Sequence, residues 1–138
     1  MGKPSVNVSQ QPPAGDQANA VVMGSFAATG VSPLFMPWGT FNLAIYGPGG
    51  PNGTWHGSVQ LERSFDGGTT WIVCQDASIT GGQAIYSAQN VDVSRVFGEP
   101  ERTVLYRLNC TAFTTGPVSY RLSQTGGAAL TWTPNGAP

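Results

Sequence analysis

Apolar and polar residues alternate with a period of two along much of this chain, and this alternation constrains the fold more than any other feature of the sequence. The pattern is typical of antiparallel strands that have one face on a core and the other in water. It is clearest in four segments, GTFNLAIYG at 39–47, GSVQLERSF at 57–65, TVLYRLNCTA at 103–112 and PVSYRLS at 117–123. Further strand candidates lie at 20–29, 70–75, 83–88 and 91–96. No long segment shows the i, i+3, i+4 spacing of a helix.

The turn residues agree with many short strands. The 138 residues include 19 glycines and 11 prolines, which break helices and suit tight turns. About eight strands at spacings of roughly 8–12 residues predict an all-β fold, an antiparallel β-sandwich of Ig-like or jelly-roll topology, over residues 20–124. The strands at 103–111 and 118–123, joined around TTGP, are predicted to form a hairpin.

The alternation also predicts which side chains face the core. In the second segment the apolar face ends on Phe65, and Glu62 and Ser64 belong to the polar face. In the third segment Cys110 and Ala112 belong to the apolar face. We expect the polar faces of both segments to lie in water.

The two ends of the chain lack any period. Residues 1–19 are rich in Pro, Gln and Asn and are predicted to form an extended arm, and residues 125–138 a similar tail. Ordering such a segment costs roughly 1–2 kcal/mol per residue, so we expect a partner surface to hold the arm. The candidate contact residues are Pro4, Val6, Val8, Pro12 and Pro13 in the arm and Trp132 in the tail.

The octapeptide SFDGGTTW matches Ser-x-Asp-x-Gly-x-Thr-Trp, the Asp-box. It resembles the repeat found around the blades of sialidases and related propellers. A propeller needs at least four blades of about 40 residues each, which is more than this chain with its single copy can supply. We therefore predict a structural strand–turn–strand of 59–65 and 70–75, in which Gly67 and Gly68 provide the positive φ of a two-residue turn. The residues of this hairpin motif are Ser64, Asp66, Gly68, Thr70 and Trp71.

No constellation of residues indicates catalysis. A glycosidase needs two carboxylates facing each other across a cleft, whereas Glu99 and Glu101 flank Pro100 and are expected in a solvated turn. The sequence contains one histidine, His56, and no Gly-x-Ser-x-Gly nucleophile elbow, so nothing in it indicates a Ser–His–Asp triad. One His and two Cys do not suggest a zinc site. We predict that the protein is not an enzyme and that it has no cofactor and no metal.

Composition narrows the class of partner. Charged residues make up 9% of the chain, against roughly 25% in an average globular protein, and the formal net charge is -1. Six scattered basic residues provide no footprint for nucleic acid, and no apolar run approaches the ~20 residues of a membrane span. A surface so poor in charge is typical of chains covered by partners in an assembly, with a neutral extracellular β-domain as the alternative.

Cysteine usage and the N-terminus predict the compartment. The first residues lack the apolar core of a secretory signal, which favours a protein made in a cytoplasm. Cys74 and Cys110 are therefore expected to be free buried thiols, with a disulfide between them as the alternative.

Several aromatic residues lie in or near predicted loops. Trp38 and Trp55, with Trp132 in the tail, are predicted to contact a partner because interface cores are rich in such rings. Trp38, Tyr46 and Trp55 are alternatively the candidates for the stacking platform of a carbohydrate-binding module. The sequence leaves both interpretations open.

Three longer segments carry a second resemblance. They are VQLERSFDGG followed by a Trp at Val59–Trp71, PE followed by LYR at Pro100–Arg107, and YRLSQ at Tyr120–Gln124. Over residues 39–124 the chain resembles small virion structural proteins of tailed bacteriophages. The resemblance does not cover the arm and brings no catalytic residue.

This resemblance implies a capsid decoration, or cement, protein on the capsid surface of a virion, made in the host cytoplasm. Its partners would be the major capsid protein, bound between subunits, and further copies of this chain, without nucleic acid or membrane. A head fibre, spike or tail component is the alternative within the virion. A carbohydrate-binding module with a glycan contact is the alternative outside it.

Overall fold

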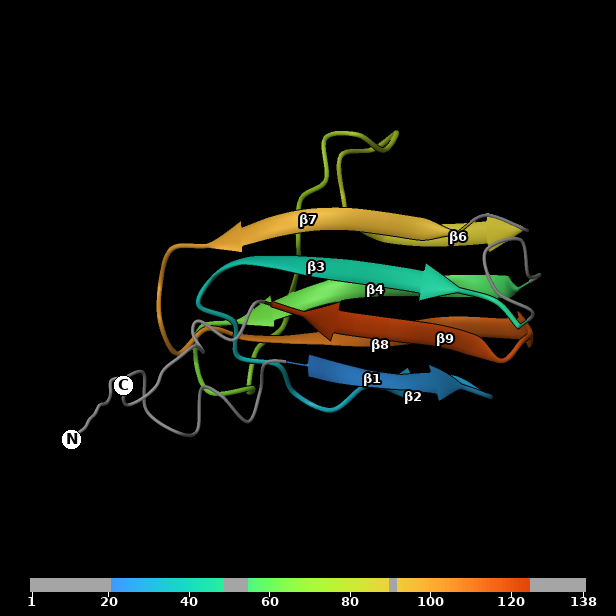
Figure 1. Cartoon of the computed structure of the whole chain (residues 1–138), viewed down its shortest axis with the longest axis horizontal. Helices are drawn as coiled ribbons and strands as arrows, with labels where there is room; N and C mark the ends of the chain where they lie inside the picture. The colour runs from blue at the N-terminus through green and yellow to red at the C-terminus, as the bar shows by residue number, and fades with distance from the viewer. Residues whose placement is uncertain (1–20, 49–54, 90–91, 125–138) are drawn as a thin grey trace, which may run out of the picture.

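The computed structural model describes residues 21–48, 55–89 and 92–124. Two antiparallel sheets pack face to face as a β-sandwich, as the alternation predicts (Figure 1). The four-stranded sheet has the order β1 (Val21–Phe26), β9 (Val118–Ser123), β3 (Gly39–Tyr46) and β7 (Val93–Glu99). The five-stranded sheet has the order β2 (Gly30–Val31), β8 (Leu105–Thr115), β4 (His56–Ser64) and β5 (Ile72–Val73), with β6 (Ile85–Gln89) also paired to β4. The described residues form no helix, and so none that is long and apolar enough to cross a membrane.

The strands pair in a nested order. β1 pairs with β9, β2 with β8, β3 with β7, and β4 with both β5 and β6. Outside the run from β4 to β6, consecutive strands alternate between the two sheets. Nested pairing of this kind is the connectivity of a jelly roll, whereas an Ig sandwich groups its first two strands in one sheet. The topology therefore selects the jelly roll from the two predicted alternatives.

The predicted hairpin of 103–111 with 118–123 is wrong. β8 lies between β2 and β4 in the five-stranded sheet, whereas β9 lies between β1 and β3 in the four-stranded sheet. Each strand has one apolar face to bury. By crossing between sheets, the chain brings Leu108 of β8 and Leu122 of β9, neither of them exposed, into the same core from opposite sides.

All eight predicted segments contain a strand, and β2 is the additional one. The candidate at 70–75 is reduced to the two residues of β5. Aromatic rings from both sheets meet in the core, where Phe41 of β3 lies edge-on to Tyr106 of β8 with centroids 4.8 Å apart. Contacts of this geometry contribute about 0.5–1.5 kcal/mol beyond the area they bury.

Ala112 was predicted to face the core but is exposed. The pairing of β4 with β8 changes register between Ser58 and Val59, where Ser58 pairs with Ala112 and Val59 with Cys110. The residue between these partners, Thr111, is therefore an insertion in the ladder. Such a β-bulge shifts the alternation of the strand by one residue, which a period-two pattern cannot anticipate.

Three side chains near the end of β4 contradict the predicted exposure to water or burial in the core. Glu62 and Ser64 were expected in water but are 5% and 0% exposed, and Phe65 was expected in the core but is 51% exposed. The strand ends at Ser64, so Phe65 belongs to the following loop, where the Arg63 guanidinium lies 4.8 Å from its ring centroid. Ser64 is buried because that loop folds back over its hydroxyl.

Candidate functional site

The Asp-box motif forms a hydrogen-bonded loop after β4. The Ser64 hydroxyl donates to Asp66 Oδ1 at 2.8 Å and accepts the Gly68 N–H at 2.8 Å. Asp66 Oδ1 also accepts the N–H groups of Thr69 and Thr70, at 3.1 and 2.8 Å. The loop returns the chain antiparallel to β4 as β5, which confirms the predicted strand–turn–strand.

The loop is longer than the predicted two-residue turn, since it runs from residue 65 to residue 71. Gly67 and Gly68 do have the expected positive φ, 74° and 97°. The Trp71 indole N–H donates to the Gly68 carbonyl at 3.0 Å, and the Arg107 guanidinium stacks 4.2 Å from the Trp71 ring centroid. The extra residues are needed because the Trp71 ring closes the loop against β8.

The Asp66 carboxylate is held within this loop by several hydrogen bonds. Hydrogen bonds from the backbone and side chain of Thr70, and then from Ser64, lower the pKa of Asp66 from 3.8 to about 2. A carboxylate that stays ionised and accepts several local donors suits a structural acceptor rather than a proton donor. The geometry therefore gives the motif a structural use.

Two ion pairs join β7 to the opposite sheet. At the end of β7, Glu99 Oε1 accepts from Arg63 Nη1 at 3.1 Å and from the Tyr106 hydroxyl at 2.7 Å. In the middle of the strand, Arg95 Nε donates to Asp76 Oδ2 at 3.2 Å. Glu99 is only 2% exposed, so its predicted place in a solvated turn is wrong. Its side chain points back under the edge strand, where Arg63 and Tyr106 compensate its burial.

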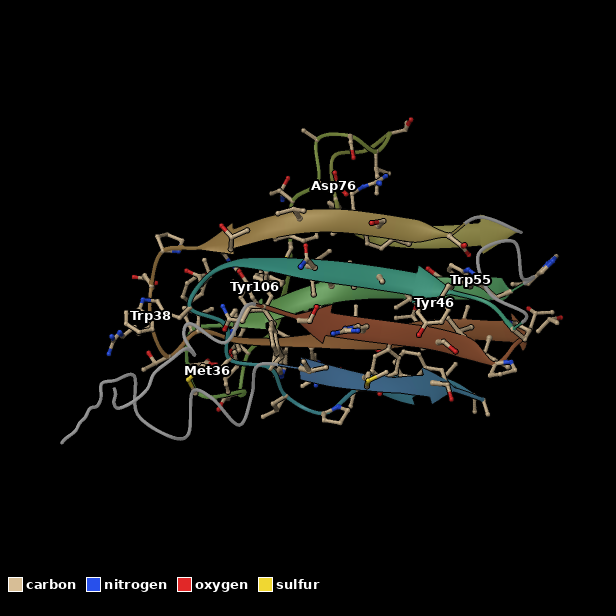
Figure 2. All side chains as sticks on the ribbon, in the orientation of Figure 1. Met36, Trp38, Tyr46, Trp55, Asp76 and Tyr106 are labelled. Atoms are coloured by element: carbon tan, nitrogen blue, oxygen red, sulfur yellow. The ribbon has the colours of Figure 1, made fainter. Side chains whose placement is uncertain are left out.

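Asp76 lies at the base of the β5–β6 loop, which projects from the sandwich (Figures 1 and 2). Its Oδ1 accepts the N–H and hydroxyl of Ser78 at 3.0 and 2.5 Å, and its Oδ2 accepts the Tyr86 hydroxyl at 2.7 Å. Burial alone would raise the pKa of Asp76, but these bonds and the one from Arg95 outweigh it and lower the pKa to about 2. The carboxylate thus anchors the projecting loop to β6 and β7.

Glu62 is the centre of a polar network on the outer face of the five-stranded sheet. It accepts from Gln60 Nε2 at 2.6 Å, Arg107 Nε at 2.8 Å and Asn109 Nδ2 at 3.0 Å. Burial would raise the pKa of Glu62, but the hydrogen bonds lower it overall. The sequence shows these polar residues on alternate positions of two strands, but it does not show that the strands are neighbours.

A cleft of about 400 Å³ opens between β5 and β7. Its walls include Arg63, Tyr106, Phe97 and Cys74. Arg63 and Tyr106 are both bonded to Glu99, and burial raises the pKa of the Cys74 thiol to about 12, which keeps it protonated. Within the described ranges, no group of three His, Cys, Asp or Glu residues could hold a metal ion.

Both cysteines are buried free thiols, as predicted, and the alternative of a disulfide between them is wrong. Cys110 lies on the apolar face of β8 with 1% of its surface exposed. No disulfide links it to Cys74.

Trp38 forms a surface cluster just before β3. Trp38 is 46% exposed, and the Arg102 guanidinium lies 3.7 Å from its ring centroid. The side-chain amide of Gln124 accepts from the Trp38 N–H at 3.1 Å and donates to the Trp38 carbonyl at 3.0 Å. Gln124, which follows β9, is thereby held beside Trp38.

The first and last described strands, β1 and β9, meet at this same end. Val21, at the start of β1, pairs with Ser123, at the end of β9 (Figure 1). The described chain therefore begins and ends on neighbouring strands, and Gln124, its last described residue, lies beside Trp38. We call the surface formed by Val21, Trp38, Arg102 and Gln124 the terminal end.

The predicted contact residues fall into three groups. The arm and tail candidates lie outside the described residues, and they are Pro4, Val6, Val8, Pro12, Pro13 and Trp132. Trp38 is exposed, as a contact residue must be. Trp55 is 0% exposed, so its prediction as a surface contact is wrong: its ring packs inside the sandwich as part of the core.

The three rings proposed as a sugar platform do not share one surface. Figure 2 shows Trp38 at one end of the sandwich and Tyr46 with Trp55 at the other. Trp55 is buried and Tyr46 is partly buried.

Comparison of the chain with family models, with curated proteins and with solved structures finds no match.

Proposed function

We propose that this protein is a structural component of the virion of a tailed bacteriophage, that it decorates the capsid, and that it attaches through the terminal end of its jelly roll. The observation that carries the proposal is that β1 begins where β9 ends, with Gln124 bonded to the exposed Trp38 at the same place. A rigid domain whose two ends leave from one point can be held there by both segments at once.

The charged groups support a structural rather than a chemical use. Three pairs of charged residues are joined in ion pairs, Arg63 with Glu99, Arg95 with Asp76, and Arg107 with Glu62. Since a general acid or base must be able to exchange its proton with a substrate, carboxylates held in this way are poor candidates for catalysis. We propose that the protein is not an enzyme.

The fold is compatible with the proposed function, and the sequence resemblance favours it. Jelly rolls are common in viral capsid and lectin domains, so the fold alone does not distinguish a capsid protein from a sugar-binding protein. The resemblance of residues 39–124 to phage virion proteins and the separation of the three aromatic rings favour the capsid. The partners are then the major capsid protein and further copies of this chain.

Co-sedimentation with particles assembled without the protein tests this function. Full-length protein is expected to sediment with purified heads, and protein lacking residues 1–18 to stay largely in the supernatant. Trp38→Ala is expected to weaken binding, whereas the matched control Val31→Ala, which removes another exposed apolar side chain, should bind normally.

Equal sedimentation of the full-length and truncated proteins would refute attachment through the terminal end. Binding to separated tails but not to heads would show the fibre or tail component instead. Binding to neither, with retention on a glycan array, would show the carbohydrate-binding alternative.

A further inference from the structure

β7 is an open edge of the four-stranded sheet. It has seven residues, pairs only with β3 in the described part of the chain, and keeps one register along its whole length. Every second residue of such an edge strand directs its N–H and C=O away from the sheet. Open edges pair with other strands unless charges, prolines, bulges or a covering segment protect them. The two charged residues of β7, Arg95 and Glu99, are paired with the other sheet, so we expect a covering segment.

The cleft between β5 and β7 lies beside this open edge. Its volume is about 400 Å³, and its apolar walls include Phe97 of β7 with Ile72 and Val73 of β5. Phe97 packs against the core but is only partly buried. Two residues earlier on β7, Arg95 crosses to Asp76 and makes that part of the edge polar. A strand added beside β7 would direct every second side chain toward the opposite sheet, and thus into this cleft.

The N-terminal arm contains one short run that suits this edge. The arm has no sustained period, but in PSVNVSQQP at 4–12 two valines alternate with small polar residues. Prolines at both ends limit the run to residues 5–11, which is the length of β7. Alternation of β-branched and polar residues between prolines is typical of a short strand. Because the run is so short, it forms a stable strand only beside an existing sheet.

We propose that residues 5–11 add to the four-stranded sheet as a fifth strand, antiparallel to β7 of the same chain. Residues directly opposite each other in such a pair share a face of the sheet. With Val8 opposite Phe97, the valine enters the cleft, and Gln10 lies opposite Arg95 and its ion pair. A register shifted by two residues would instead place Val8 against that ion pair. Apolar and polar side chains thus select one register.

The linker between this run and β1 has the length that the pairing requires. β1 is the opposite edge of the same sheet, so the added strand would lie four strand spacings away, roughly 19 Å. In the proposed register residue 11 is opposite Ser94, whose row across the sheet includes Met23, two residues along β1 from Val21. The linker must therefore span roughly 20 Å. A flexible linker of ten residues has a root-mean-square length of about 16–19 Å and an extended length of about 33 Å.

This match favours pairing within one chain over pairing between copies. A linker whose length fits the span gives the tethered segment an effective concentration on the order of mM. The added strand caps β7 and fills the cleft beside it, which prevents copies from associating through this edge. The pairing belongs to the free protein and does not depend on attachment to a capsid.

Amide hydrogen exchange of the full-length protein, followed residue by residue by NMR, tests the pairing. If residues 5–11 cover β7, consecutive amides from 94 to 98 are all protected, whereas an open edge protects only every second one. Val8→Lys should speed exchange of the edge-facing amides at least about tenfold, because it places an ammonium group in the cleft beside Arg63. Asn7→Lys is the matched control, since it adds the same charge on the face that points to water. Thermal melting checks that both variants keep the fold.

Alternating protection along β7 in the wild type would overturn the proposal, as would equal exchange rates in the two lysine variants. Protection that rises with protein concentration between about 10 and 500 µM would show that the arm of another copy covers the edge. Loss of protection in Trp132→Ala but not in Val8→Lys would show that the C-terminal tail covers it. Either of these results would also refute the pairing proposed.

Discussion

Replacing Asp76 with Asn removes the one negative charge that holds the β5–β6 loop to β6 and β7. The carboxylate accepts four hydrogen bonds, two from Ser78 and one each from Tyr86 and Arg95, and its side chain is 8% exposed. These bonds hold its pKa at about 2, against 3.8 for an ordinary Asp. At about 1.36 kcal/mol per pKa unit, the difference corresponds to roughly 2 kcal/mol of folding stability.

The sign follows from the lowered pKa. Because the folded protein holds the proton less tightly than the unfolded chain does, the stabilisation is complete above the unfolded pKa of 3.8 and is lost as the pH falls through about 2. Urea unfolding of the wild type and of Asp76→Asn between pH 6 and pH 2 measures this directly. We expect the free-energy gap between the two proteins to shrink by about 2 kcal/mol over that range.

Ser78→Ala provides a graded control. It removes one side-chain donor and leaves the carboxylate, so its gap to the wild type should change with pH by a smaller amount. If the unfolding free energies of the wild type and Asp76→Asn fall in parallel from pH 6 to pH 2, Asp76 does not stabilise the folded state through its charge, and the reasoning fails.

Three further results are expected. Gly68→Val should lower the unfolding free energy by about 2 kcal/mol, because Gly68 has a φ of 97° that a β-branched residue resists. The control Gly98→Ala should be nearly neutral, because Gly98 lies in open space on β7. Equal urea midpoints for the two variants would show that the loop tolerates a side chain at Gly68. Trp55→Ala should cost about 3–5 kcal/mol and Trp38→Ala less than about 1, and the reverse order in urea titrations would contradict the observed burial. Burial raises the pKa of Cys74 to about 12, so at pH 8 this thiol should react with a thiol reagent only as fast as the surrounding structure opens locally. A reaction rate that does not change with denaturant concentration would disprove this.

The sequence alone determined the class of fold and the place of most strands. Alternation with a period of two is a local property of the chain, so the eight predicted segments each contain a strand. The hairpin motif was equally readable, because Ser64, Asp66 and Gly68 bond to one another within a few residues. Hydrogen bonds between residues so close in sequence do not depend on how distant segments of the chain pack.

The tertiary structure decided which strands became neighbours and which polar side chains were buried. β8 and β9 are adjacent in sequence but enter different sheets, because each must bury its apolar face against the other sheet. Glu99 was expected in water, yet it is buried beside Arg63, which lies 36 residues earlier in the chain. Trp55 and Trp38 look alike in sequence, and only the packing around them makes one a core residue and the other a surface residue. Burial depends on which distant segments pack against a residue, and the apolar period of a single strand does not indicate which strands will pair with it.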